Sequence, residues 1–313
     1  MSSLRDRHSH TGFELAAMPR RTLKSAISCV GRGLHGGRDV ALRLLPGPCG
    51  SGVVFRRTDL GVSIPAKFDQ VNDTRLCTVL GEGAARVGTI EHLMAAIAAC
   101  GIDDLVIEVD AAELPILDGS AAPFMFLIES AGIIEHGGHR ETLEILRVVR
   151  VEHNGAFAEL RPHNPGGIGF DLSLAIEFSA AAIGAQAYSL HLTAESFARE
   201  LAAARTFTLA GEIEALRKAG LAKGGSLANA IVVDGDKVLN PEGLRWEDEF
   251  VRHKLLDVVG DLALAGAPIS GRFVGSRTGH ALNNLLLRAV FADAANYRLA
   301  SASLAGVLQL TAA

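Results

Sequence analysis

Residues 247–266 read EDEFVRHKLLDVVGDLALAG, and their pattern predicts a long amphipathic helix from about Glu247 to Leu264. The positions between its polar residues are mainly Val, Leu and Phe, which is more apolar surface than an exposed helix carries. Part of the polar stripe should therefore be buried, although a solvated polar face is the alternative. Four polar residues recur at intervals of four, which places them on one helical face: Glu249, His253, Asp257 and Asp261.

The same stripe contains potential metal ligands. His253 and Asp257 form an H-x-x-x-D pair, which can present a nitrogen and an oxygen to zinc or another divalent metal. His92 is the candidate third ligand, and it follows Glu91 at the start of a second predicted helix, EHLMAAIAAC. Glu91 can then serve as the base that activates a metal-bound water. The alternative is that Glu91 only favours the positive helix end and that His92 packs in the core.

Each half of the chain runs strands first and helices later. We expect short strands over 23–60, a helix capped by Thr89, a strand over 105–109 and a second helix capped by Ser120. HGGHR (136–140) is the candidate linker. In the second half, strand-like segments precede a helix opened by Thr193, the long helix and a last helix near 282. Residues 1–20 are polar and unpatterned, so we expect a disordered extension, with Met18 as an alternative start.

Composition excludes several classes of protein. Hydrophobic residues make up 49% of the 313 residues, which excludes a mostly disordered chain. The formal charge of −5 argues against a nucleic-acid binder. The chain contains no uninterrupted apolar run of about 18 residues, so no membrane span is predicted. The four cysteines are scattered without C-x-x-C spacing, as in a reduced, cytoplasmic protein.

Two phosphate- or nucleotide-binding motifs can also be set aside. GRGLHG (31–36) matches G-x-G-x-x-G, but the residues that follow alternate like a strand, whereas a dinucleotide site requires a helix there. KGGS (223–226) lacks the rest of a phosphate-binding loop, and no G-x-S-x-G nucleophile elbow occurs in the chain.

Several short segments follow one another in a distinctive order: RTLK, GRGLHGG, FRRTDL, DTRLCT, GTIEHLMAA, PILDGSAAPF, ARTF, GGSLANAIV, VLNPEGLRWEDEFVRHKLLDVVGDL and GHALNN. Together they resemble the UDP-3-O-acyl-N-acetylglucosamine deacetylases, the zinc amidases of lipid A biosynthesis, from about Arg21 to Leu299. The resemblance implies an α+β fold of two similar domains, each a sheet packed on two helices, with small insertions and the active site between them. The domains are expected at 21–138 and 139–305, the second with an insertion that forms a passage for the acyl chain.

The resemblance also implies one zinc ion per chain, with another divalent metal as the alternative, bound by His92, His253 and Asp257. It implies five catalytic residues: Glu91 as general base, protonated His280 as oxyanion stabiliser and acid, Asp261 as its orienting partner, Thr206 as a donor to the oxyanion, and Lys254 beside the ligand helix. It further implies eight substrate-binding residues: His35, Phe207, Leu209, Ile213, Ala222, Ser226, Leu227 and Arg277.

The chain departs from the family pattern at Arg32, at Ser179-Ala180 and at Lys223. These departures bear on acyl-chain preference and on contacts to the nucleotide, and they leave the metal and base positions unchanged. From the resemblance we expect a cytoplasmic monomer that binds a UDP-linked acylated amino sugar, without nucleic acid and without stable membrane insertion. The alternatives are a zinc amidase acting on another acylated substrate, a non-catalytic sugar-nucleotide-binding regulator, or a structural protein.

Overall fold

The computed structural model describes residues 18–164 and 167–301. Residues 1–17, most of the expected disordered extension, lie outside this part. The end of that extension is not disordered, because Pro19 and Arg20 begin strand β1 (Pro19–Leu23). β1 pairs antiparallel with β10 (Ile133–His139), which contains most of the predicted linker. The linker prediction is thus wrong for 136–139, because the backbone of these residues pairs with β1 in a sheet.

A five-stranded sheet forms the outer layer of the first half. In its strand β3, Val40, Leu42 and Leu44 are buried and alternate with exposed residues, so one face of the sheet lies on the core. A small sheet of β6 (Val71–Asp73), β7 (Val79–Glu82) and β8 (Ala85–Val87) leads into the helices. The five strands, in sheet order, are β2 (Ile27–Arg32), β3 (Asp39–Pro46), β9 (Leu105–Val109), β4 (Val53–Arg57) and β5 (Val62–Pro65). The helices of this half are α1 (Glu91–Ala99) and α2 (Ala122–Ala131).

The second half has a seven-stranded sheet, in which the central strand β19 (Ile269–Ser276) pairs with β13 (Ala156–Arg161), β14 (Phe170–Glu177) and β11 (Glu141–Ile145). Its other strands are β12 (Val149–His153), β15 (Ala185–His191) and β20 (Tyr297–Ser301). Its helices are α3 (Ala194–Glu200), α5 (Glu249–Leu262) and α6 (His280–Phe291).

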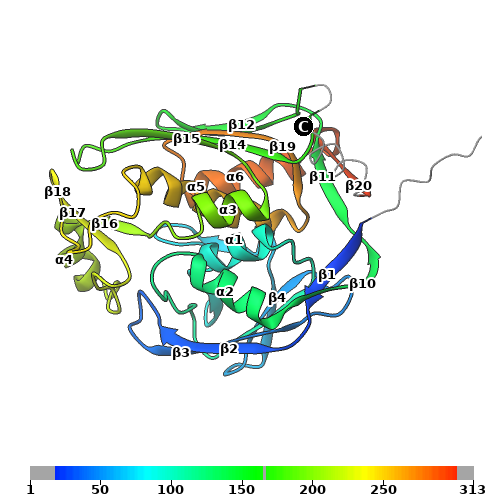
Figure 1. The fold of residues 1–313 in the computed structure, drawn as a ribbon, viewed down its shortest axis with the longest axis horizontal. Coiled ribbons are helices and arrows are strands. Elements are labelled where there is room, and N and C mark those ends of the chain that lie inside the picture. Colours follow the sequence, from blue (N-terminus) through cyan, green and yellow to red (C-terminus); the bar gives the residue numbers. More distant parts are fainter. Residues whose placement is uncertain (1–17, 165–166, 302–313) are drawn as a thin grey trace, which may run out of the picture.

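A smaller unit is inserted between α3 and α5, and Figure 1 places it at one end of the molecule. It consists of β16 (Phe207–Leu209), α4 (Ala210–Lys218), β17 (Ile231–Asp234) and β18 (Lys237–Val238). Its three strands form a separate sheet. The remaining short elements are 3₁₀ turns at Phe68–Gln70, Ala263–Ala265 and Ala294–Asn296.

The helices other than α4 lie between the two large sheets, so that α1 of the first half packs against α5 of the second (Figure 1). Gly260 makes this contact close, because a Cβ at that position would lie 2.0 Å from the carbonyl oxygen of Glu91. Any side chain larger than hydrogen would push the helices apart. The crossing therefore brings the start of α1 directly onto α5.

The mixed α+β fold predicted from the sequence is confirmed, whereas the domain boundary at 138–139 stays a prediction. The long helix begins and ends within two residues of expectation, and α6 begins at His280 rather than near 282. None of the helices in the described ranges has the length and apolar character that a membrane crossing requires.

The predicted helix caps have mixed outcomes. Thr193 is confirmed, since it forms a capping box with Ser196. Thr89 is not the cap of α1, because its backbone has a positive φ of 56° and its buried hydroxyl has no hydrogen-bond partner. Ser120 lies one residue before the N-cap of α2, although its Oγ still accepts the N–H of Ala122 at 3.3 Å.

Candidate active site

A cavity opens where the first turns of α1 and α6, the middle of α5 and the start of the insertion meet. Leu34, Leu76, Ile116 and Phe178 give part of its wall an apolar character. The cavity brings together nine residues named from the sequence: Glu91, His92, Thr206, Phe207, Leu209, His253, Lys254, Asp257 and His280.

The three expected metal ligands converge on one point. His92, His253 and Asp257 are all buried, and their potential ligand atoms lie within 4.8 Å of one another. The Nε2 atoms of His92 and His253 are 3.8 and 3.4 Å from Oδ1 of Asp257. This Oδ1 is buried and has no hydrogen-bond partner. A buried carboxylate oxygen without a donor is costly, so the donor set fits a bound cation.

The surroundings hold the ligands in the protonation states that a metal requires. His253 Nδ1 lies 3.0 Å from the carbonyl oxygen of Ala204, which favours the tautomer whose Nε2 lone pair is free. Burial lowers the pKa of His92 to about 3 and also lowers that of His253, so both rings are neutral. Burial would raise the pKa of Asp257, but the positive charges of Lys254, whose Nζ is 2.7 Å from Oδ2, and of protonated His280 hold it below its usual range.

The pKa values of Glu91 and His280 are both raised, but that of His280 is raised further. Burial raises the pKa of the Glu91 carboxyl group to about 7. Burial alone would lower the pKa of His280, but the adjacent carboxylate of Asp261 outweighs it and raises that pKa to about 9. Between these values Glu91 is ionised while His280 carries a proton, which is the pairing that a general base and a general acid require.

Asp261 lies outside the cavity lining and acts on His280 from behind. Its Oδ2 is 2.9 Å from His280 Nδ1 and accepts the Nδ2–H of Asn283 at 2.8 Å. Its Oδ1 accepts the hydroxyl of Thr78 at 2.6 Å. We name these residues, Asp261, His280, Asn283 and Thr78, the Asp261 cluster. His280 Nε2 thereby faces Glu91 Oε1 across 3.9 Å.

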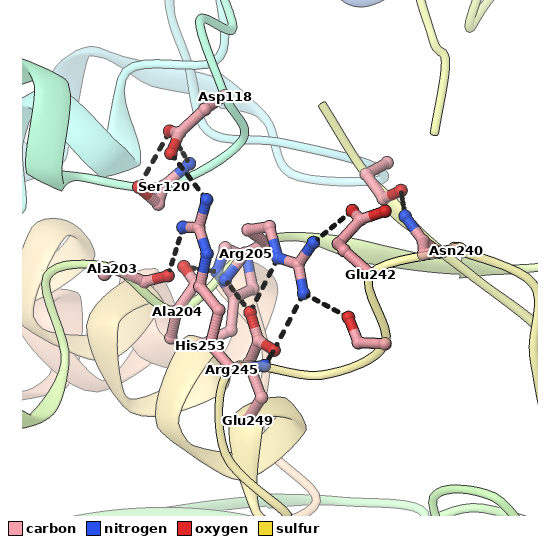
Figure 2. Close-up of polar contacts among 12 residues, drawn as sticks. Asp118, Ser120, Ala203, Ala204, Arg205, Asn240, Glu242, Arg245, Glu249 and His253 are labelled. Atoms are coloured by element: carbon pink, nitrogen blue, oxygen red, sulfur yellow. Dashed lines mark hydrogen bonds and ion pairs between the residues drawn. The ribbon is translucent and has the colours of Figure 1, made fainter. Parts of the chain in front are cut away.

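A second buried polar group surrounds Glu249 at the other end of α5 (Figure 2). Glu249 is fully buried and accepts from the guanidinium and backbone N–H of Arg205 and from the backbone N–H of Arg245. The Arg205 guanidinium also donates to Glu242 and to the carbonyl of Gly243. We name Arg205, Glu249, Glu242 and Arg245 the Arg205 cluster. It fixes the backbone between Ala204, the partner of His253, and Thr206.

The predicted substrate-binding residues fall into two groups. Phe207 and Leu209 line the cavity, and Phe207 packs edge-on against Phe178 and Phe250. The rest lie outside that lining. Ile213 is on α4, and His35 is in a turn next to a loop of the insertion. The backbone N–H of Lys223 in that loop donates to the His35 carbonyl at 3.2 Å. That loop carries Ala222, Ser226 and Leu227. Arg277 also lies outside, where it donates to the carbonyl of Gly155.

Cys49, Asp104 and His136 form a second group of potential metal ligands. Here the carboxylate already has partners, because Arg20 donates to both oxygens of Asp104 at 2.8 Å and Gly52 donates to Oδ1 at the same distance. His136 Nε2 lies 2.9 Å from Oδ2. These contacts form a salt-bridged network that links Arg20 of β1 to His136 of β10. Both oxygens of Asp104 have partners, whereas Oδ1 of Asp257 has none.

Sequence reasoning gave no role to Thr78, Asn283 or Arg205. Thr78 and Arg205 lie within the quoted segments DTRLCT and ARTF, and Asn283 within GHALNN. The sequence carries no sign that their side chains meet Asp261 or Glu249, which lie 183, 22 and 44 residues away along the chain.

Comparison with known proteins agrees with this geometry. The family described as UDP-3-O-acyl N-acetylglycosamine deacetylase matches residues 20–292. The chain belongs to this family. Proteins named UDP-3-O-acyl-N-acetylglucosamine deacetylase are similar to it over most of their length. That of Chromobacterium violaceum is 49% identical over 86% of this chain and 89% of its own. That of Myxococcus xanthus is 48% identical over 90% of both chains.

The similarity holds in a third relative. The protein of the same name from Psychrobacter cryohalolentis is 47% identical over 91% of this chain and 89% of its own. The matched span, residues 20–292, contains α1, α5 and α6 and every residue of the cavity lining and of both polar clusters.

Proposed function

We propose that this chain hydrolyses the N-acetyl group of UDP-3-O-acyl-N-acetylglucosamine with one zinc ion bound by His92, His253 and Asp257. The reaction itself follows from the family: the chain is an amide hydrolase that deacetylates a UDP-linked, 3-O-acylated amino sugar in lipid A biosynthesis. The observation that carries the metal assignment is the buried, unpartnered Oδ1 of Asp257 between two imidazole nitrogens. We further propose that the enzyme is a cytoplasmic monomer.

The bound metal would polarise the amide carbonyl and lower the pKa of a water molecule. Glu91 takes the proton from that water, since its pKa near 7 makes it a base at neutral pH. His280, which keeps its proton up to about pH 9, stabilises the developing oxyanion and supplies the proton to the leaving amine. Thr206 lines the same cavity, and we propose that its hydroxyl donates to the oxyanion.

Two further features support the assignment of the substrate. Phe178, Phe207 and Leu209 give the cavity an apolar side next to its polar centre, which suits an acylated sugar. The insertion that carries Ile213, Ala222, Ser226 and Leu227 borders this side, and we propose that it accommodates the acyl chain. His35 and Arg277 are proposed to contact the substrate outside the cavity.

The test is acetate release from UDP-3-O-acyl-N-acetylglucosamine by the purified, zinc-loaded protein, with and without a chelator. We expect release that the chelator abolishes and that added zinc restores. Release that persists after the metal has been removed would refute the metal-dependent mechanism. A folded, zinc-loaded protein that releases no acetate from this substrate would contradict the substrate assignment.

A further inference from the structure

Thr78 binds two functional carboxylates that belong to different helices. It is 2% exposed and lies directly before β7. Its backbone N–H donates to Oε2 of Glu91 at 3.1 Å, and its hydroxyl donates to Oδ1 of Asp261 at 2.6 Å. Glu91 is on α1 and Asp261 is near the end of α5, so one residue joins the two sides of the site.

These contacts close a ring of four residues, which we name the polar ring: Thr78, Glu91, His280 and Asp261. Thr78 holds one oxygen of each carboxylate, and the other oxygen of each carboxylate faces His280. Asp261 Oδ2 lies 2.9 Å from His280 Nδ1, and Glu91 Oε1 lies 3.9 Å from His280 Nε2. Thr78 and His280 thus occupy opposite corners of the ring.

The hydrogen bonds of the polar ring fix the orientations of the Glu91 and Asp261 carboxylates, which the two helices alone do not determine. A carboxylate held by one oxygen can still rotate about its last torsion, which is broad in side chains. Because Thr78 takes Oδ1 of Asp261, Oδ2 remains in place for His280 and Asn283. Because it takes Oε2 of Glu91, Oε1 points towards His280 and the cavity. Thr78 itself does not line the cavity, although the two residues before it, Leu76 and Cys77, do.

We propose that Thr78 is a positioning residue of the deacetylation reaction, which holds the base Glu91 and the Asp261–His280 pair in one geometry by hydrogen bonds to both carboxylates. This inference rests on the roles proposed above for Glu91, Asp261 and His280. Removing a hydrogen-bond partner from behind the ligands of a metal site typically lowers metal affinity or activity 10- to 100-fold, and we expect a loss of that size in activity here.

The central experiment compares Thr78→Val with Thr78→Ser. Valine has the shape of threonine but lacks the hydroxyl, whereas serine keeps the hydroxyl and both keep the backbone N–H. We expect Thr78→Val to lower kcat about 10- to 100-fold with little change in KM, zinc content or melting temperature. Thr78→Ser should stay within a few-fold of the wild type. If valine does not fold at this position, Thr78→Ala replaces it in the same comparison.

Thr22→Val is the matched control for loss of a buried threonine hydroxyl. Thr22 is 3% exposed, and its hydroxyl donates to the backbone carbonyl of Asp104, away from the cavity. This variant should lose stability without losing kcat. A parallel loss of stability and kcat in Thr78→Val, with no rescue by serine, would show a structural role and overturn the inference.

A double-mutant cycle separates this inference from the proposed mechanism. If Thr78 acts through Asp261, then Thr78→Val should have little further effect on kcat in an Asp261→Asn background. Independent, multiplicative losses would overturn the positioning role even if the enzyme uses zinc and Glu91 as proposed. An inactive wild-type protein would instead contradict the proposed function itself, so the two failures are distinguishable.

Discussion

The two ends of α5 carry buried acidic residues on the same helical face, yet their surroundings differ. Glu249 is bound by the guanidinium of Arg205 and by two backbone N–H groups, and it lies away from the cavity. Asp261 is bound by two neutral donors and by His280, a group that titrates. Removing a buried carboxylate from a permanent cation leaves that cation uncompensated and destabilises the fold, whereas a carboxylate that faces an imidazole sets the charge of that imidazole.

This difference makes separate predictions for the two clusters. Changes in the Arg205 cluster should alter the free energy of unfolding more than kcat, and changes around the Asp261 cluster should alter kcat and its pH dependence more than stability. The following variants test that division, beginning with the largest expected effect.

Glu91→Gln should lower kcat about 10³-fold, because the glutamine amide cannot take a proton from water. Its shape is retained, so zinc stoichiometry measured by elemental analysis should be unchanged. Glu144→Gln, at a half-exposed position on β11 that pairs with Arg298, is the control and should keep full activity. Loss of zinc in Glu91→Gln would mean that Glu91 is a ligand or a structural residue, and the assigned role as base would be wrong.

Glu249→Gln should reduce the free energy of unfolding by about 3 kcal/mol, because Arg205 would remain buried without its main counter-charge. Urea denaturation measures this, and kcat of the folded protein should stay within a few-fold. Glu242→Gln is the matched control, since Glu242 pairs with the same guanidinium from a half-exposed position. It should cost less than about 1 kcal/mol. A large loss of kcat at unchanged stability in Glu249→Gln would erase the distinction between the clusters.

Asp261→Asn should lower kcat about 10²-fold, a loss comparable to that of one oxyanion donor. The neutral asparagine side chain cannot stabilise a positive charge on His280. Without the carboxylate that outweighs it, burial then lowers the pKa of His280. The basic limb of the pH–rate profile should therefore move to lower pH. An unchanged basic limb in this variant, or in His280→Ala, would show that another group titrates there.

The wild-type profile of kcat/KM against pH should be bell-shaped, with limbs near pH 7 and pH 9. Activity rises through the first value as Glu91 loses its proton and falls through the second as His280 loses its own. One pH unit below the acid limb, activity should therefore be about ten-fold lower. A rate that stays flat from pH 6 to 8 would contradict the raised pKa of Glu91.

Much of this site could be predicted from the sequence because its central residues repeat at helical spacing. The interval of four from Glu249 to Asp261 predicted one face of α5, and its apolar neighbours predicted burial, which the structure confirms. The α+β class followed from strands that precede helices. These signals are local, so a single sequence carries them.

The contacts that join distant segments could not be predicted in this way. Thr78 and Asp261 are 183 residues apart, and no local pattern distinguishes a threonine that binds a carboxylate from one that packs. Thr89 illustrates the opposite error, since a threonine before a helix usually caps it, but here the backbone has a positive φ. The predicted linker failed because Gly-Gly suits a loop, while pairing with β1 makes it a strand.

The contact between Gly260 and the backbone of Glu91 constrains how the substrate reaches the site. The proposed base Glu91 is on the first half of the chain and the proposed metal ligands His253 and Asp257 are on the second, so a hinge motion that opened the halves would pull Glu91 away from His253 and Asp257. Because the two helices touch backbone to backbone, they should move as one body. Entry and release of the acylated sugar must then depend on movement at the rim of the cavity, with the catalytic centre left rigid.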